Sequence, residues 1–153
     1  MSSSLNIRLA RVEEHAALVA LQVRASLANE GDRAMLLSRL DQITFPVEEI
    51  ARGQVVVVEA PDGRMLGFAS ALPRADGDVE LDGLFVEPDA WKAGAGSALV
   101  AHVAAHARAS GARAVHVVGN AHALGFYARC GFVQVGEEQT PFGPVAPRLK
   151  LTL

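Results

Sequence analysis

The stretch 84-LFVEPDAWKAGAGSAL-99 runs from an apolar strand pattern through a proline into a glycine-rich loop and then into a helical pattern. Glycine is unfavourable at a helix start unless the bare backbone is needed there. A helix start leaves about four backbone N–H groups without partners and carries partial positive charge, so small side chains let an anion approach. The loop alone therefore predicts either a phosphate cradle or a tight turn that holds no ligand.

Two phosphate-binding motifs are excluded by the residues that accompany the glycines. A Walker loop requires Gly-Lys-Ser/Thr, but Gly96 is followed directly by Ser97 with no lysine between them. A dinucleotide-binding GxGxxG motif requires a third glycine where this chain has Leu99. The loop therefore belongs to another kind of strand-to-helix turn.

Upstream of the loop, the hydrophobic pattern predicts one strand followed by helices. Residues 5–10 alternate as a first strand, and helical spacing follows over residues 11–28. A second, shorter helix is predicted over residues 31–40, and residues 45–53 carry helix start and stop signals. The apolar stripe predicted for the first helix consists of Val12, Ala16, Val19, Val23 and Leu27.

The rest of the chain is predicted to alternate between strands and helices. The strands are expected over residues 54–60, 64–73, 77–88, 112–119, 132–138 and 145–153, and the helices over 94–111 and 120–131. Asn120 is expected to cap the start of the last helix. The order β-α-α-β-β-β-α-β-α-β-β predicts an α/β domain with a mixed sheet.

Length and charge narrow the class of protein. The 153 residues suit one domain, which we expect to span residues 1–153. A formal net charge of −3 and a pI near 5.9 argue against a nucleic-acid or membrane-surface binder. The start MSSSLNIRLA lacks the charged and apolar regions of a signal peptide, and no apolar run approaches the roughly 18 residues of a membrane span. We therefore expect a cytoplasmic protein without nucleic-acid or membrane partners.

Metal ligands are sparse in the sequence. Cys130 is the single cysteine, which excludes an internal disulfide and a cysteine metal cluster. His102 and His106 have a metal-ligand spacing on a predicted helix, but no HExxH glutamate and no third ligand lie near them in the sequence. We expect no bound metal.

A second motif lies downstream, in 119-GNAHALGFYARCGF-132. Together with the loop, it makes the chain resemble the GNAT superfamily of N-acetyltransferases. The acetyl-CoA loop of that family reads Val-x-Pro and then Arg/Gln-x-x-Gly-x-Gly/Ala, and an Asn-x-x-Ala-x-x-Phe-Tyr helix and Gly-Phe come later. The element order matches from residue 5 to residue 153. The resemblance implies a single GNAT-like domain whose mostly antiparallel sheet of six to seven strands is flanked by about four helices and splayed between its fourth and fifth strands.

The resemblance also implies acetyl-CoA as the co-substrate and assigns residues to it. Loop amides would hold the diphosphate, and the backbone of the fourth strand would pair with the pantetheine arm. The implied cofactor-binding residues are Leu84, Phe85, Val86, Trp91, Lys92, Ala93, Gly94, Ala95, Gly96, Ser97, Asn120, Ala123 and Phe126. Trp91 stands where Arg or Gln is commonest in the family, so the resemblance does not carry the usual side-chain contact to the diphosphate over to this position.

For catalysis, the resemblance implies direct attack of an amine on acetyl-CoA in a ternary complex. Tyr127 would protonate the leaving thiolate. Glu80 is the first choice for the base that accepts the proton of the amine, Asp82 is the second, and ordered water is the remaining alternative. Since Glu80 and Asp82 are two residues apart on one predicted strand, they share a face unless a bulge intervenes.

The acceptor is expected to be a small-molecule or peptide amine. Its site would be shaped by residues 24–50 and by the loop near Phe142-Gly143-Pro144. The carboxylates that favour a cationic amine are Glu30, Asp32, Glu80 and Asp82. The alternative function is a CoA-binding sensor or interaction module without catalysis, and the dimers common in the family make a homodimer a candidate assembly.

Overall fold

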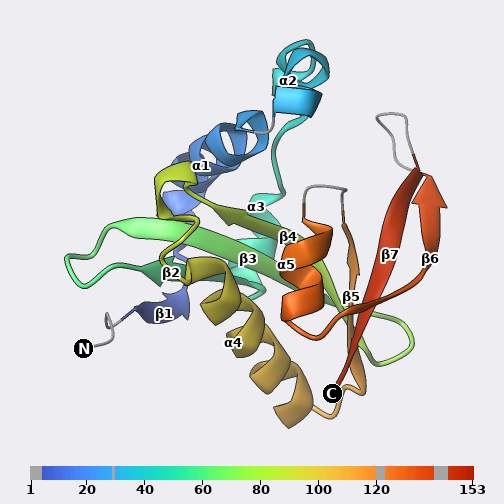
Figure 1. Cartoon of the computed structure of the whole chain (residues 1–153). Coiled ribbons are helices and arrows are strands. Elements are labelled where there is room, and N and C mark those ends of the chain that lie inside the picture. The colour runs from blue at the N-terminus through green and yellow to red at the C-terminus, as the bar shows by residue number, and fades with distance from the viewer. Residues whose placement is uncertain (1–4, 29, 120–122, 140–144) are drawn as a thin grey trace. The chain divides into compact units, whose positions relative to one another are not determined.

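The computed structural model describes residues 5–28, 30–119, 123–139 and 145–153, with the elements labelled in Figure 1. The strands are β1 (Asn6–Leu9), β2 (Val55–Glu59), β3 (Met65–Pro73), β4 (Val79–Val86), β5 (Ala114–Val118), β6 (Val133–Gln139) and β7 (Val145–Thr152). The helices are α1 (His15–Leu27), α2 (Glu30–Leu37), α3 (Val47–Ala51), α4 (Ala95–Ala109) and α5 (Leu124–Arg129). Three 3-10 turns are η1 (Val12–Glu14), η2 (Leu40–Gln42) and η3 (Pro88–Ala90).

The strands form one mixed sheet in the order β1-β2-β3-β4-β5-β7-β6. Antiparallel pairs join β1 to β2, β2 to β3, β5 to β7 and β6 to β7. The parallel pair of β4 and β5 is in register at Val79↔Val115 and Glu80↔His116, the first two residues of β4. The predicted α/β fold with a mixed, mostly antiparallel sheet is confirmed, and the short β4–β5 register agrees with the predicted splay.

The chain divides into two compact units. The first comprises Met1–Ser70 and Gly83–Leu99, and the second comprises Ala71–Asp82 and Val100–Leu153. β4 and α4 each contribute residues to both units, so the unit boundaries fall within elements rather than at a linker. The assignment of one domain to residues 1–153 stays a prediction.

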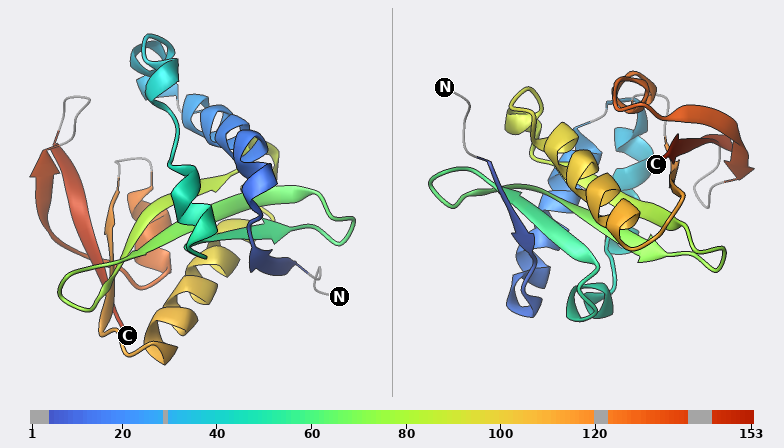
Figure 2. Two further views of the ribbon diagram at one scale, coloured as in Figure 1. Left: turned by 180° about the vertical axis from the view of Figure 1, so that it is seen from behind. Right: turned by 90° about the horizontal axis from the view of Figure 1, so that it is seen from below.

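The core of the first unit lies between two helices and the sheet. Leu18 and Leu21 of α1 and Ile50 of α3 are buried with Val57 of β2 and Phe68 of β3. Figure 2 shows α1 and α3 over the same face of β2 and β3. Burial of one such side chain stabilises the fold by about 1.5–3 kcal/mol, so this cluster holds both helices on the strands.

The buried face of α1 differs from the predicted stripe. The buried residues of the helix are Leu18, Leu21 and Ala25, whereas Ala16 is exposed and Val12, which lies in η1, is 51% exposed. The prediction is wrong because most residues of this helix are apolar, and several faces therefore satisfy helical spacing. The leucines decide the face, since they bury more apolar area than alanine.

The core of the second unit is built on α4, β5 and α5. Val100, Val103 and Ala107 of α4 are buried at helical spacing, and β5 is buried along residues 114–117. At the end of α5, a Cβ on Gly131 would lie 3.1 Å from Leu151 Cδ1 of β7, so this turn lies directly against β7. None of the helices in the described ranges is both long enough and apolar enough to cross a membrane.

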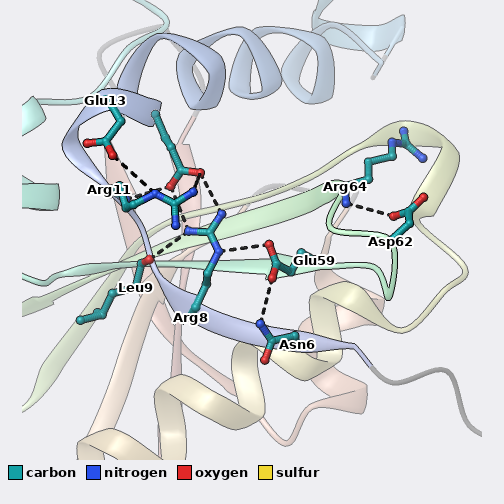
Figure 3. A network of polar contacts seen from close by, with 9 residues as sticks. Asn6, Arg8, Leu9, Arg11, Glu13, Glu59, Asp62 and Arg64 are labelled. Atoms are coloured by element: carbon teal, nitrogen blue, oxygen red, sulfur yellow. Dashed lines mark hydrogen bonds and ion pairs between the residues drawn. The ribbon is translucent and has the colours of Figure 1, made fainter.

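A polar network ties the N-terminal strand of the first unit to its neighbours (Figure 3). The Arg8 guanidinium donates to both oxygens of Glu14 at 2.9 and 2.8 Å and to Glu59 at 3.1 Å. Asn6 donates to the other oxygen of Glu59 at 2.9 Å. The bond from Arg8 lowers the pKa of Glu14 to about 2. The network thus joins β1, η1 and β2 through charged side chains.

Candidate active site

The glycine loop joins β4 to α4 in the first unit (Figure 1). Gly94 has a φ of +82°, a left-handed conformation that favours glycine. Its carbonyl accepts the N–H of Ala98 at 3.0 Å and so caps the start of α4. The intervening amides of residues 95–97 have no acceptor within the helix. A Cβ on Gly94 would meet no described atom within 4 Å, so the turn has open space around it at the positively charged start of α4.

The predicted phosphate-contact residues, 92 to 97, all lie on this loop. Lys92, Ala93, Gly94 and Ser97 are exposed, whereas Gly96 is half-buried and Ala95 is buried. Among the described residues, the side chains of Lys92 and Ser97 make no hydrogen bond. The loop therefore offers a ligand its main chain and, at its rim, the charge of Lys92.

Trp91 is anchored to the strand that precedes the loop. Its indole Nε1 donates to the Val86 carbonyl at 3.0 Å, while the residue stays 52% exposed. The side chain thereby links the end of β4 to the turn that leads to Gly94. At the position where the family usually has Arg or Gln, this chain has a side chain that binds its own backbone.

Glu87 fixes the beginning of the loop, which the sequence analysis did not foresee. Its N–H donates to the Leu66 carbonyl at 2.8 Å, and its buried carboxylate accepts from the Arg24 guanidinium at 3.0 and 2.5 Å. The pairing raises the pKa of Arg24. The partners are 63 residues apart in the chain, so no local pattern could have signalled this contact.

The segment Leu84–Val86, predicted to bind pantetheine, lies at the end of β4 in the first unit. All three residues are half-buried, and the Phe85 ring lies 5.4 Å from that of Phe68. A Cβ on Gly67 of β3 would lie 2.6 Å from the Phe85 carbonyl oxygen, so glycine is required there for the close approach of the two strands. Packing thus holds this stretch of backbone in place.

Tyr127 lies on α5 in the second unit and is only 6% exposed. Its ring contacts Phe126 and Phe132 edge-on, with centroids 5.2 and 5.3 Å apart. Burial raises the pKa of its hydroxyl to about 12. The hydroxyl makes no hydrogen bond to a described residue, so its proton is free for a ligand and is retained throughout the neutral pH range.

The start of α5 differs from the prediction. The helix begins at Leu124 with Ala123 at the N-cap and without a side-chain cap, so the predicted start at Asn120 is too early. Ala123 and Phe126 are half-buried. Asn120 and the loop Phe142-Gly143-Pro144 lie outside the described residues.

Glu80 lies on β4 in the second unit and is held by two cations. Its Oε1 accepts from Arg74 Nη1 at 2.6 Å and lies 4.0 Å from Arg148 Nη2. Arg148 in turn donates to Glu138 at 2.5 Å. Sequence reasoning missed these partners, because Arg148 and Glu138 come from β7 and β6, far along the chain. The predicted base is thus a member of an ion-pair network.

Asp82 lies beside Glu80 on the rim of a pocket. The hollow has a volume of about 380 Å³ and is lined by Glu80, Leu81, Asp82, Val118, Glu138 and Arg148. Asp82 is exposed, and among the described residues its carboxylate has neither an ion pair nor a hydrogen bond. Both predicted base residues therefore line one cavity of the second unit, but Glu80 is ion-paired, whereas Asp82 has no partner among the described residues.

A third polar group of the second unit combines Asp76, Asp78 and His116. Each can bring one ligand atom within 4.8 Å of the others, which is a geometry that could hold a metal ion. Their atoms already have partners in the protein: Asp78 accepts from His116 Nε2 at 2.9 Å and from the Arg113 N–H at 3.1 Å, and Asp76 accepts from Arg74 at 3.2 Å. The bond from His116 lowers the pKa of Asp78. The expected absence of a metal stays a prediction.

Comparison with known proteins supports one family. The model of the acetyltransferase (GNAT) family matches residues 16–132. A GCN5-related N-acetyltransferase structure from Rhodopseudomonas palustris is 22% identical, with 100% of this chain and 97% of that chain covered and a TM-score of 0.76. No curated protein matches the sequence significantly.

Two further solved structures share the fold. A PaiA N-acetyltransferase from Thermoplasma acidophilum in complex with coenzyme A is 17% identical, with 98% and 99% coverage and a TM-score of 0.75. The ribosomal-protein-S18-alanine N-acetyltransferase from Escherichia coli is 19% identical, with 97% and 93% coverage and a TM-score of 0.71. At these identities, the likeness shows the fold alone.

Proposed function

Because the chain belongs to the acetyltransferase (GNAT) family, we propose that it transfers the acetyl group of acetyl-CoA to a primary amine by direct attack in a ternary complex. The observation that carries this proposal is the open helix start at Gly94, whose left-handed φ and unobstructed surroundings suit a diphosphate. Such a turn also suits a diphosphate because the first amides of α4 lack partners within the helix and carry partial positive charge.

Acetyl-CoA would be held mainly by the main chain of the first unit. The amides of residues 95–97 would bind the diphosphate, and Lys92 would add positive charge at the rim. The backbone of Leu84–Val86 would pair with the pantetheine arm. Trp91 would support this arrangement indirectly, because its bond to Val86 fixes the loop to the strand.

Tyr127 would act as the general acid. Collapse of the tetrahedral intermediate breaks the C–S bond, and the departing thiolate needs a proton. A hydroxyl whose pKa is raised to about 12 carries that proton at every neutral pH. Because such a phenol is a weak acid, the proton would move as negative charge develops on the sulfur rather than before.

The proton of the attacking amine would go to a carboxylate of β4 or to ordered water. Glu80 and Asp82 both line the pocket of the second unit. The first is ion-paired to Arg74, whereas the second has no partner among the described residues. The acceptors named for the solved relatives belong to those proteins, so the acceptor of this chain has to be identified from its own residues.

The proposal is tested by measuring binding and turnover separately. Calorimetry is expected to show acetyl-CoA binding in the micromolar range, and thiol release is expected with at least one member of a panel of primary amines. Absence of binding at millimolar acetyl-CoA would overturn the cofactor assignment. Tight binding without turnover on any amine would instead indicate a CoA-binding module without catalysis.

A further inference from the structure

The pocket of the second unit carries more negative than positive charge. Its lining includes three carboxylates, Glu80, Asp82 and Glu138, and one guanidinium, Arg148. The remaining lining residues, Leu81 and Val118, are apolar. At about 380 Å³, the hollow is large enough for a small amine or for the end of a longer one.

Two of the three carboxylates are neutralised within the protein. Arg148 Nη1 lies 2.5 Å from a Glu138 oxygen, and Arg74 Nη1 lies 2.6 Å from a Glu80 oxygen. Arg148 also lies 4.0 Å from Glu80, so the four side chains form one network. Such a network fixes the walls of the pocket but leaves little attraction for an incoming cation.

Asp82 is the carboxylate that this network leaves out. It is exposed, and no described residue pairs with it or donates a hydrogen bond to it. Asp82 is therefore the lining carboxylate whose charge remains available to a cationic acceptor.

We infer that Asp82, rather than Glu80, binds the acceptor as its ammonium ion and receives its proton, and that the pocket selects amines without a carboxylate beside the reacting nitrogen. The inference rests on the proposed function. Glu80 is then a positioning residue, which pairs with Arg74 and helps to hold Arg148 in the wall of the pocket.

With Asp82 as the base, acetyl transfer releases one proton to solution. The ammonium ion gives one proton to the Asp82 carboxylate, which later releases it to water. The amine nitrogen forms a bond to the thioester carbonyl carbon, and the C–S bond breaks. The nitrogen also loses a second proton, and the sulfur gains one proton when the C–S bond breaks. The products are therefore an amide, a free thiol and one proton in solution.

Selectivity follows from the charge of the lining. An acceptor with a carboxylate on the carbon next to its amine would add a negative charge close to the unpaired carboxylate of Asp82, which is unfavourable. Arg148 cannot readily compensate that charge, because it is already bound to Glu138. A second positive charge on the acceptor would meet no such repulsion.

The test compares three amines of similar chain length: pentylamine, 1,5-diaminopentane and 2-aminohexanoate. For the wild-type enzyme, kcat/KM for 2-aminohexanoate is expected to be at least about tenfold below that for pentylamine, and the diamine should equal or exceed pentylamine. Asp82→Asn should lower kcat/KM for pentylamine about 100-fold and leave KM for acetyl-CoA unchanged. Asp82→Glu should restore part of the activity.

Two further variants separate the role of Asp82 from that of the network. Glu80→Gln is expected to cost less than about tenfold in kcat/KM for pentylamine, because it does not touch the acceptor. Glu13→Gln, which removes an exposed carboxylate of the first unit, should leave all constants unchanged. The inference is overturned if Asp82→Asn keeps wild-type amine kinetics, if Glu80→Gln is the more damaging variant, or if the wild-type enzyme prefers 2-aminohexanoate. Failure of the proposed function is seen separately, as absence of thiol release from the wild-type enzyme with every amine.

Discussion

The glycine loop of the first unit offers a ligand different chemical groups from those of α5 and the pocket in the second unit. The loop offers main-chain amides around Gly94, and its exposed Lys92 and Ser97 side chains make no hydrogen bond among the described residues. The second unit offers side chains: the buried hydroxyl of Tyr127 and the carboxylates of β4. Cofactor binding would therefore depend on backbone conformation, whereas chemistry would depend on individual functional groups.

This difference implies opposite responses to mutation. In the loop, a substitution that preserves the backbone conformation should leave the affinity for acetyl-CoA nearly unchanged. A substitution that alters φ should weaken it. In the second unit, removal of a single oxygen should reduce turnover while the fold and the affinity for acetyl-CoA stay the same.

The largest effect is expected for Tyr127→Phe. The change removes the proton donor but keeps the ring that packs on Phe126 and Phe132. Loss of a general acid lowers kcat about 100- to 1,000-fold, and KM for acetyl-CoA should stay unchanged. Steady-state rates with a saturating amine measure the effect, and thermal unfolding checks that Tm is preserved. Turnover close to wild type would remove Tyr127 from the mechanism.

The ionisation of the same tyrosine gives the next largest effect. Because the chain has one tyrosine, absorbance near 295 nm reports its phenolate selectively. Because the hydroxyl is buried, the native protein is expected to titrate with a tyrosine pKa of about 12 instead of the ordinary value of 10.0. Since the folded pKa lies above the unfolded value, the associated stability is fully present below pH 10 and is lost as the pH rises from 10 to 12. A native pKa near 10 would mean that the hydroxyl is exposed to solvent.

In the loop, Gly94→Ala should raise KM for acetyl-CoA about tenfold, because a side chain disfavours the left-handed φ that aims the amides. Gly53→Ala is the matched control, since Gly53 also has a positive φ, +73°, and open surroundings but lies after α3. Both variants should lose about 1–2 kcal/mol of stability. Equal changes in KM for the two variants would show that the effect comes from strain in general and not from the loop.

The smallest effect is expected for Trp91→Phe, which removes the donor to the Val86 carbonyl but keeps an aromatic ring. Loss of one such hydrogen bond costs about 0.5–1.5 kcal/mol. The affinity for acetyl-CoA should therefore fall a few-fold at most, with kcat unchanged, as measured by calorimetry and initial rates. A loss of 100-fold or more would mean that Trp91 contacts the cofactor directly.

Local patterns predicted most of the fold. The strand-to-helix loop and the helix ends at Gly111 and Gly131 depend on residues adjacent in sequence, and the structure has each of them close to its predicted bounds. The buried face of α1 could not be predicted, because an almost uniformly apolar helix has no unique stripe. Its orientation is set by Leu18 and Leu21 against strands far along the chain.

The roles assigned to the glycine loop, Tyr127, Glu80 and Asp82 stay predictions. The structure places two of these residues, Glu80 and Asp82, in the lining of one pocket. The charge network that distinguishes Glu80 from Asp82 was not predictable, because it brings together Arg74, Glu138 and Arg148 from three separate segments. The hydrogen bond from Trp91 to the Val86 carbonyl was also not predictable, because it depends on the shape of a turn that no single residue type determines.

Titration of CoA into the wild-type protein, Gly94→Ala and Tyr127→Phe by calorimetry tests the division between main-chain binding and side-chain chemistry most directly. We predict micromolar binding by the wild-type protein, an affinity about tenfold weaker for Gly94→Ala, and an unchanged affinity for Tyr127→Phe despite its loss of turnover. Wild-type affinity in Gly94→Ala together with weakened binding in Tyr127→Phe would contradict this account.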